Sequence, residues 1–483
     1  MTLLKNFKNL DKYTKAAFII ILIGIIIRFS LAFIYNPSGD ACWHLSVARF
    51  IANNNSIPTF EPLGRYAFWV FPFFHIIAAF LYKLSSIFSK EVAEFSMKFI
   101  SPFFGSLTLL LTFQIAKKLY NKKIAFYATL FIAFLPISIY YGSISFLGAM
   151  VSFFVLLSVL FMLKNKVSFS AISVSIAILT KYMAIFIVPV LLYILYVNNK
   201  DRKKLIKKIL ILCFILLIIV TPWLARNYIV LGNPFWPFLT SIFGGYESYL
   251  PAVSFEDVSS KKIFDINYLS RIHLGLFGFP HGNISSLSFL NVPFIELLFT
   301  GWLILTILFI LPFFIGLFKV NYKNNKTKIL IAWIGLFLIG LLLYIINTGA
   351  SYPRLLLPGL AAISIIWAIG LETILKKYKK IIKLFLICCI IMFISAEFIK
   401  FTIATNAWGF YSDDFKWIKE NTKKTDIFMV DGQCIHYNIN RFTTEPSKDF
   451  KDAHYIWYNQ NFKIEIGSIL SQEIVNEIKM QNL

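Results

Sequence analysis

The chain has 483 residues, of which 58% are hydrophobic, 18% aromatic and only 15% charged, and its mean hydropathy is +0.71. Soluble domains are about 45–50% apolar, so this composition excludes a large soluble enzyme. The formal net charge is +23, but the lysine clusters lie in short loops between apolar runs, where basic residues mark the cytoplasmic side of a membrane protein. We therefore expect no nucleic-acid partner.

Apolar runs of helical length follow one another along the sequence and predict an all-α polytopic membrane protein. About 20 consecutive apolar residues span a bilayer as a helix. The first run, residues 16–35, has that length and no small-residue cleavage site precedes Asp40, so we expect a retained first helix and not a signal peptide. Two shorter runs, 169–180 and 182–197, meet at Lys181. The runs centre near residues 25, 78, 107, 132, 155, 175, 190, 217, 306, 338, 363 and 391.

Basic loops set the predicted orientation, with the N-terminus in the cytoplasm of a multi-pass plasma-membrane protein. Between the outer loop at Asp40 and the basic loop 117–123 lie two apolar runs, although an odd number of crossings is required. We expect the run after Arg65 to be re-entrant or interfacial, which gives about 11 to 13 transmembrane helices in total. The segments predicted outside are those around Asp40, Lys181 and Arg354, residues 226–294 and the tail after Lys400.

The composition changes after residue 400 and predicts a small C-terminal α/β extracytoplasmic domain. Residues 413–421 have the pattern of an amphipathic helix, 426–430 that of a strand, and Asp431-Gly432 that of a turn. The predicted domains are a membrane domain of residues 1–400, with outer loops 36–67 and 226–294, and an extracytoplasmic domain of residues 401–483.

Asp40 is the candidate reactive carboxylate. It follows Asn-Pro-Ser-Gly directly after the first apolar run, in a neighbourhood that is otherwise apolar and aromatic. Residues 42–53 have the pattern of a helix lying in the membrane interface. Two interpretations of Asp40 stay open: it N-caps that helix, or its carboxylate deprotonates an incoming nucleophile at the outer rim of the membrane.

Lys181, Arg226 and Arg354 are three cations that the predicted topology brings to the level of Asp40. Lys181 divides two short helices, Arg226 is expected to end a helix, and Arg354 to begin one. A single Lys or Arg at a helix end is commonly a side chain that snorkels to the interface. Because three converge on one level, we interpret them as a site for a phosphate, which at that depth is carried by a lipid.

Other residues near this level are candidates for substrate binding, each with a structural alternative. His44, one turn after Asp40, is equally consistent with an interfacial side chain, and Glu61 with a solvated loop residue. A disulfide between Cys42 and Cys434 is compatible with the topology, but nothing in the sequence supports it. No cysteine or histidine spacing suggests a metal site. The candidate set is Arg28, His44, Glu61, Arg65 and His281.

Several motifs, in this order along the chain, resemble one family. They are similar to the lipid-phosphosugar-dependent glycosyltransferases of the GT-C fold, of the dolichyl-phosphate-mannose protein mannosyltransferase and aminoarabinose transferase type. The motifs are Arg28 with Gly39-Asp40, Leu179-Thr180-Lys181-Tyr182, Thr221-Pro222-Trp223-Leu224-Ala225-Arg226-Asn227-Tyr228, Tyr352-Pro353-Arg354-Leu355-Leu356-Leu357-Pro358 and Phe415-Lys416-Trp417-Ile418.

The resemblance implies transfer of a single hexosyl or pentosyl unit from a polyprenyl-phosphate donor to a glycan, lipid or protein acceptor. The reaction would take place at the outer face of the membrane, within the cell envelope. It implies Asp40 as general base and Lys181, Arg226 and Arg354 as ligands of the donor phosphate, with no metal and no other cofactor. The chain departs from many members of the family because Ala41 follows Asp40 where a second carboxylate is common. Glu61 is the candidate replacement.

Two other classes compete with the enzyme. A secondary transporter or flippase for a lipid-linked or small polar substrate predicts internal repeats and ionisable residues near the midplane. No repeat is visible, and apart from Arg28 and His75 the positions within the runs are almost purely apolar. A structural or assembly protein predicts no charges at one common level. The level-matched charges therefore favour the enzyme.

Overall fold

The computed structural model of the chain divides it into two compact units. Unit 1 comprises Met1–Phe33, Phe99–Pro222 and Val253–Phe401, and unit 2 comprises Ile34–Lys98, Trp223–Ala252 and Thr402–Leu483. The structure describes residues 10–59, 68, 70–236, 238–245, 266–278, 295–348, 352–406, 412–423, 426–429, 433–444 and 455–456.

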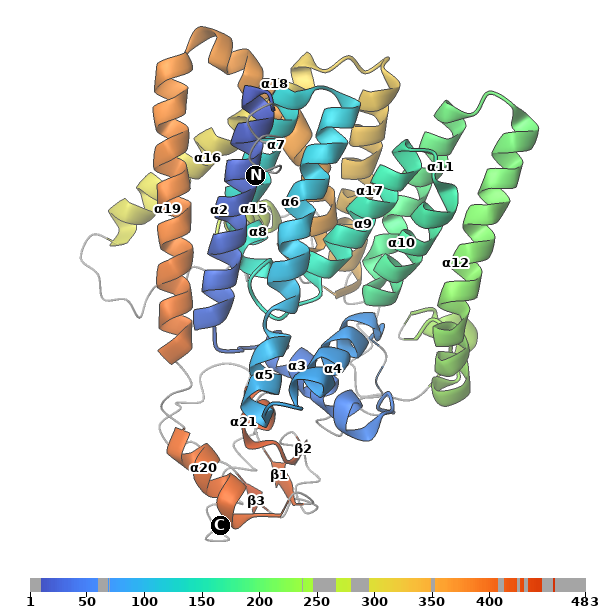
Figure 1. Ribbon diagram of the computed structural model, residues 1–483, viewed down its shortest axis with the longest axis vertical. Helices are drawn as coiled ribbons and strands as arrows, with labels where there is room; N and C mark the ends of the chain where they lie inside the picture. Colours follow the sequence, from blue (N-terminus) through green and yellow to red (C-terminus); the bar gives the residue numbers. More distant parts are fainter. Residues whose placement is uncertain are drawn as a thin grey trace. The chain divides into compact units, whose positions relative to one another are not determined.

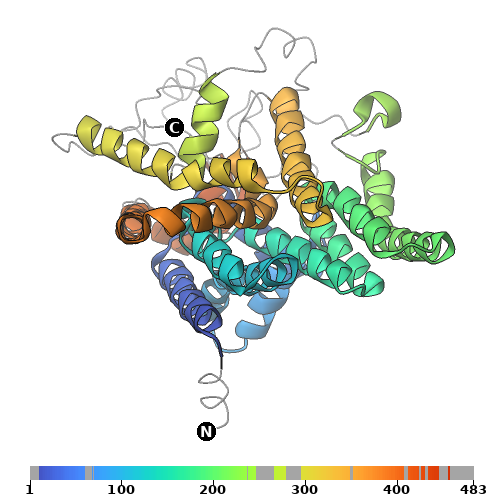
Figure 2. The ribbon, with the colours of Figure 1, turned by 90° about the horizontal axis from the view of Figure 1, so that it is seen from above.

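Unit 1 is a bundle of helices, drawn in Figure 1 and seen from above in Figure 2. Of the predicted run centres, that at residue 78 lies in α4 of unit 2 and the others lie in helices of the bundle, so the prediction from hydropathy is confirmed. The helices are α2 (Lys12–Ile34), α6 (Ile100–Leu119), α7 (Lys122–Phe134), α8 (Pro136–Tyr141), α9 (Gly148–Leu163), α10 (Val167–Thr180), η1 (Tyr182–Ile187), α11 (Val188–Asn198), α12 (Arg202–Leu231), α15 (Ile266–Leu276), α16 (Ile295–Lys319), α17 (Asn325–Thr348), η3 (Pro353–Gly359), α18 (Leu360–Lys377) and α19 (Lys379–Asn406).

Seven helices among the described residues are long and apolar enough to cross a membrane. Four more apolar helices are shorter, including α9, α10 and the pair η1–α11. The chain is therefore a multi-pass membrane protein, whereas the predicted total of about 11 to 13 crossings stays a prediction.

Helix α18 forms the centre of unit 1. In the segment Pro353–Lys377, 83% of the spanning window is buried, against 17% for α12, which lies at the side of the bundle in Figure 2. A Cβ atom at Gly370 would overlap the carbonyl oxygen of Pro312, and one at Gly316 that of Ile366. Small residues thus let the backbones of α16 and α18 approach closely, as in other membrane helix pairs.

The helices of unit 1 are interrupted at two of the predicted cations. Lys181 is extended, with φ −158° and ψ 128°, between α10 and the 3-10 helix η1. Arg354 lies at the start of the second 3-10 helix, η3, which begins with Pro353. The residue before a proline avoids the helical region, and Tyr352 is extended, with φ −111° and ψ 98°. Both predicted breaks are confirmed.

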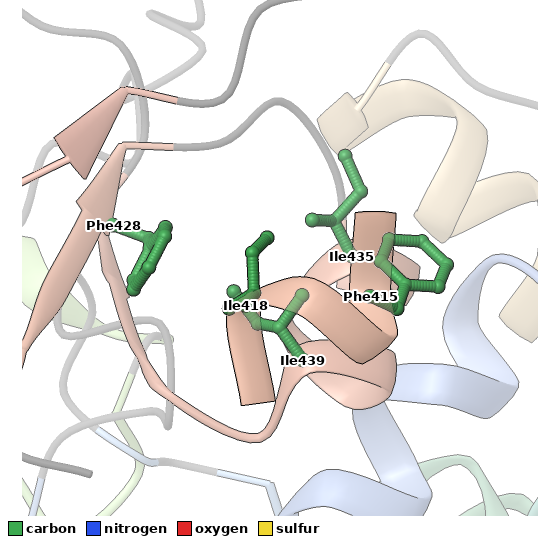
Figure 3. Close-up of a cluster of buried hydrophobic side chains, with 5 residues drawn as sticks. All are labelled: Phe415, Ile418, Phe428, Ile435 and Ile439. Carbon is green, nitrogen blue, oxygen red and sulfur yellow. The ribbon is translucent and has the colours of Figure 1, made fainter. Parts of the chain in front are cut away.

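Unit 2 combines short helices with a small parallel sheet. The sheet has the order β2-β1-β3, and α21 connects β1 to β2 as a crossover. Phe415 and Ile418 of α20, Phe428 of β1 and Ile435 and Ile439 of α21 form one buried cluster (Figure 3). The elements are α3 (Asp40–Asn54), α4 (Phe73–Ser85), α5 (Lys90–Met97), α13 (Thr240–Phe243), α20 (Ser412–Asn421), β1 (Ile427–Met429), α21 (Gln433–Ile439), β2 (Phe442–Thr444) and β3 (Tyr455–Ile456).

The C-terminal predictions are met in part. Helix α20 and strand β1 lie where the pattern predicts them, while Asp431-Gly432 falls outside the described residues. Residues 402–483 group with 34–98 and 223–252 in unit 2. The compact units thus follow a different division from the two predicted domains, and a separate domain of residues 401–483 stays a prediction.

Candidate functional site

Asp40 is the exposed first residue of a buried helix. The nine residues that follow it, Ala41–Arg49, are all buried. Gly39 occupies the N-cap position with φ +52°, a region that glycine adopts readily, and no side chain caps the helix by a hydrogen bond. The interpretation of Asp40 as an N-cap is therefore wrong, because the carboxylate stands one residue inside the helix.

A disulfide fastens the turn that precedes Asp40. Cys42 is bonded to Cys434 of α21, 392 residues later in the chain. The Cys434 sulfur lies 3.8 Å from the carbonyl oxygen of Gly39 and 3.9 Å from that of Pro37. The sequence left this pairing open, and the disulfide is present in the structure. It ties the C-terminal segment directly to the backbone that carries Asp40.

A second set of contacts joins α21 to α3 and α5. Arg49 forms an ion pair with Glu94 at 3.0 Å and donates a hydrogen bond to the carbonyl oxygen of Tyr437 at 3.0 Å. The Tyr437 hydroxyl donates to the other carboxylate oxygen of Glu94 at 3.1 Å. Burial, with a contribution from Glu94, raises the pKa of the Tyr437 phenol above its ordinary value. Tyr437 therefore acts here as a neutral donor.

His44, four residues after Asp40 in α3, lies in a cluster of aromatic side chains. It is 5% exposed, and its Nδ1 is 3.0 Å from Nε2 of His75. Trp43 and Phe74 pack edge-on against the two imidazoles. This enclosure favours the structural alternative for His44, which helps to hold α3 against α4.

Arg226 holds a loop of unit 2. Its guanidinium donates hydrogen bonds to the carbonyl oxygens of Phe68 at 2.6 Å and Pro58 at 2.9 Å, and stacks 5.0 Å from the ring centroid of Trp223. Helix α12 continues to Leu231, so the expectation that Arg226 ends a helix is wrong. These contacts favour a role in positioning the loop.

Lys181 and Arg354 come together on one aromatic ring in unit 1. The Lys181 Nζ lies 5.5 Å and the Arg354 Cζ 4.9 Å from the ring centroid of Phe146. Arg354 also stacks 4.4 Å from the ring of Tyr352. Cations near an aromatic face are held electrostatically without losing their charge. Two of the three predicted phosphate ligands therefore form one positively charged group at the two helix breaks.

Arg28 is an interior residue that caps a helix end. It is fully buried and donates hydrogen bonds to the carbonyl oxygens of Ile132 and Ala133, in the last turn of α7, and to Ser138. A cation stabilises the negative end of a helix. This arrangement favours a structural role over the predicted contact with substrate. The other candidates, Glu61, Arg65 and His281, fall outside the described residues.

One buried ion pair was not among the sequence-based predictions. Glu397 of α19 is 1% exposed and accepts a hydrogen bond from Lys400 at 2.6 Å. Lys400 also donates to the carbonyl oxygen of Gly278 at 3.2 Å and lies 4.4 Å from the ring of Tyr140. Ionisable groups within membrane helices are costly unless paired. An acidic residue in the last apolar run was a visible signal for this pair.

One family model matches part of the chain. The model of the dolichyl-phosphate-mannose-protein mannosyltransferase family matches residues 72–225. This range includes His75, Phe146 and Lys181. No curated protein matches the chain.

Solved structures extend the likeness over most of the chain. ArnT from Cupriavidus metallidurans, bound to undecaprenyl phosphate, is 11% identical with a TM-score of 0.58; the match covers 89% of this chain and 85% of ArnT. The chain has the GT-C fold. The apo oligosaccharyltransferase of Archaeoglobus fulgidus is 14% identical with a TM-score of 0.57, over 90% of this chain and 65% of that protein. The chain thus spans about two thirds of the archaeal enzyme's length. The family match and these structures together confirm the resemblance predicted from the motifs.

Within the described residues, no three His, Cys, Asp or Glu side chains are grouped so that they could hold a metal ion. The expected independence from metal stays a prediction for this GT-C protein, because Glu61 and the neighbouring loop residues lie outside the described ranges.

Proposed function

We propose that the chain is a membrane glycosyltransferase that moves a single sugar from a polyprenyl-phosphate donor to an acceptor at the outer face of the membrane. The family match over residues 72–225 supports this proposal, as do two similar proteins whose structures contain undecaprenyl phosphate and dolichol-phosphate. The observation that carries it is the cation pair of Lys181 and Arg354 around Phe146, at two breaks in apolar helices.

The cation pair suits the leaving group of this reaction. When the bond between the anomeric carbon and the phosphate oxygen breaks, the lipid phosphate departs as a monoester and gains negative charge. Lys181 and Arg354 stabilise that charge in the transition state. A stabilisation of about 3 kcal/mol corresponds to about a hundredfold in rate.

Asp40 is the general base of the proposed reaction. Its carboxylate takes the proton of the acceptor hydroxyl as the acceptor oxygen bonds to the anomeric carbon. Its exposure at the start of α3 leaves it accessible to an acceptor, and the Cys42–Cys434 disulfide fixes the turn before it. The negative charge that the phosphate carries away is balanced by this proton transfer.

The proposed orientation places Asp40 outside and the N-terminus in the cytoplasm. The basic loops between apolar helices support it through the positive-inside rule. The disulfide gives independent support, because such bonds persist in oxidising compartments and are rare in the cytosol.

The test uses the purified full-length chain, polyprenyl-phosphate donors with different sugars, and release of lipid phosphate as the readout. We expect release with one donor, and a loss of about 10²- to 10⁴-fold for Asp40→Asn, the range of general-base catalysis. Asp413→Asn, an exposed carboxylate at the start of α20, is the matched control and should keep full activity. Equal activity in both variants would remove Asp40 as the base.

One observation favours the alternative, a transporter or flippase. The buried pair of Glu397 and Lys400 lies in an apolar helix, where transporters place coupling groups. Glu397→Gln should abolish transbilayer movement of a polyprenyl-phosphate sugar in vesicles if the chain is a flippase. No movement by the unmodified chain, with phosphate release intact, would exclude this alternative.

A further inference from the structure

Unit 2 contains a cavity lined in part by the segment that leads to Asp40. The cavity has a volume of about 770 Å³ and is lined by residues of α3, α5, α20 and α21 and by Asn36 and Pro37. Asn36 lies four residues before Asp40 in the chain. The volume falls within the usual 300–1,000 Å³ range of small-molecule sites.

The lining is too polar for a lipid tail. Of its fifteen residues, eight are charged and three are asparagines, namely Asn36, Asn438 and Asn440. Apolar chains gain free energy by leaving water for apolar surroundings, which this lining does not provide. Hydroxyl-rich molecules are better matched, because amides and charged groups can exchange hydrogen bonds with them.

Positive charge exceeds negative charge around the cavity. Five lining residues are Lys or Arg and three are Glu. Arg49 and Glu94 pair with each other, which leaves four lysines and two glutamates. Lys90 of α5 and Lys419 of α20 are exposed into it from two separate elements. Among the described residues, neither ammonium group has an ion-pair partner.

The two lysines act on each other. Burial lowers the pKa of Lys419 from its ordinary value, and the charges of Lys90 and Arg49 lower it further. Like charges that face one space repel, and an anion between them converts this repulsion into attraction. Phe95 lines the same space, and the Nζ of Lys98, another lining residue, lies 5.2 Å from its ring centroid.

We propose that this cavity binds the acceptor, and that the acceptor is a saccharide with an acidic group, a phosphate or a carboxylate, held between Lys90 and Lys419. The inference rests on the proposed function and names the substrate class of its second reactant. The donor is not the occupant, because its phosphate has its own cations in unit 1 and its polyprenyl chain does not suit this lining.

A binding experiment tests the ligand class without catalysis. Thermal unfolding of the purified full chain is followed with glucose 6-phosphate, glucuronate and glucose, each at matched ionic strength. The two acidic sugars should raise Tm, since a ligand of the folded state stabilises it, and glucose should not. Stabilisation by only one acidic sugar identifies the acidic group; equal effects of all three overturn the inference.

Variants locate the effect. Lys90→Ala combined with Lys419→Ala should abolish the Tm shift, and Lys90→Gln with Lys419→Gln repeats the test with a closer side-chain match. Lys423→Ala, an exposed lysine that does not line the cavity, should keep it. A shift that survives both double variants overturns the assignment to this cavity.

Kinetics separate this inference from the proposed function. The double variant should raise the acceptor KM by about tenfold or more, the value of a lost charge-assisted hydrogen bond, and raise the donor KM less. Binding of acidic sugars without any phosphate release would contradict the proposed function and support the assignment of an acidic saccharide to the cavity. Full phosphate release with equal acceptor KM in the double variant and Lys423→Ala would contradict acceptor binding in the cavity and leave the proposed function supported.

Discussion

The two groups of candidate residues, one in each unit, are built by different means. In unit 1, Lys181 and Arg354 stand at breaks between apolar helices, and one aromatic ring, Phe146, serves both. In unit 2, Asp40 stands on a helix that is secured by a disulfide and by the ion pair of Arg49 with Glu94. Local sequence determines the two helix breaks in unit 1. Contacts between segments far apart in the chain bring both cations to Phe146 and also hold helix α3 in unit 2. Substitutions of Lys181, Arg354 and Asp40 should therefore affect the proposed chemistry most directly. Substitutions of the residues that hold α3 should affect stability more.

Apart from Asp40→Asn, the largest effect should come from the cation pair. Lys181→Ala together with Arg354→Ala should lower kcat for sugar transfer by roughly 10³-fold, because two donors to the developing phosphate charge are lost. Unfolding temperature should change little, since neither side chain is in the core.

Lys166→Ala is the matched control for this variant. Lys166 is an exposed lysine of unit 1 that also lies near a phenylalanine ring, 5.8 Å from the centroid of Phe169. It should retain transfer. If the control and the double variant lose activity equally, the two cations at Phe146 have no special part in the reaction.

The disulfide should give the next largest effect, and on stability. Cys434→Ser opens a link between residues 392 apart and should lower the free energy of unfolding by about 2–4 kcal/mol. The midpoint of thermal unfolding measures this loss, and kcat should also fall because the turn of Gly39 is released.

Cys213→Ser, at an exposed free cysteine, provides the comparison for that variant. The oxidised wild-type chain should match this control, and the chemically reduced wild-type chain should match Cys434→Ser. Identical unfolding midpoints for all four samples would contradict a stabilising role of the bond.

The difference between local signals and long-range contacts also explains what could be predicted from the sequence. Apolar runs, the break at Lys181 and the proline before Arg354 are local signals, because helix length and backbone restriction are properties of neighbouring residues. The pairing of Cys42 with Cys434 and of Arg49 with Tyr437 joins segments almost 400 residues apart. Nothing in either segment specifies its partner, so the sequence could only leave the disulfide open.

For charged residues within apolar runs, the sequence alone does not distinguish a structural role from a substrate contact. A lone cation within an apolar run predicts a substrate ligand at Arg28, whereas its hydrogen bonds to the carbonyl groups at the end of α7 favour a structural role. Those carbonyls belong to a segment about a hundred residues away. Glu397 shows the opposite case, in which a local signal was present and its importance was missed.

The smallest predicted effect is a pH dependence in the part of unit 2 that the disulfide secures. His436 lies in α21, two residues after Cys434. Burial, with repulsion from Arg49, lowers the pKa of its imidazole to about 3. In the unfolded chain the pKa is about 6.5, so the unfolded state binds more protons between these values. Stability is therefore complete above about pH 6.5 and declines below it, by at most about 1.4 kcal/mol per pH unit.

Comparing wild type with His436→Gln isolates this contribution. The free energy of unfolding of the wild-type chain should fall more steeply from pH 6.5 to 5 than that of the variant, whatever their difference at pH 7.5. Parallel slopes would mean that the imidazole of His436 has about the same pKa in the folded and unfolded chain. In that case neither burial nor Arg49 would perturb it in the part of unit 2 that the disulfide secures.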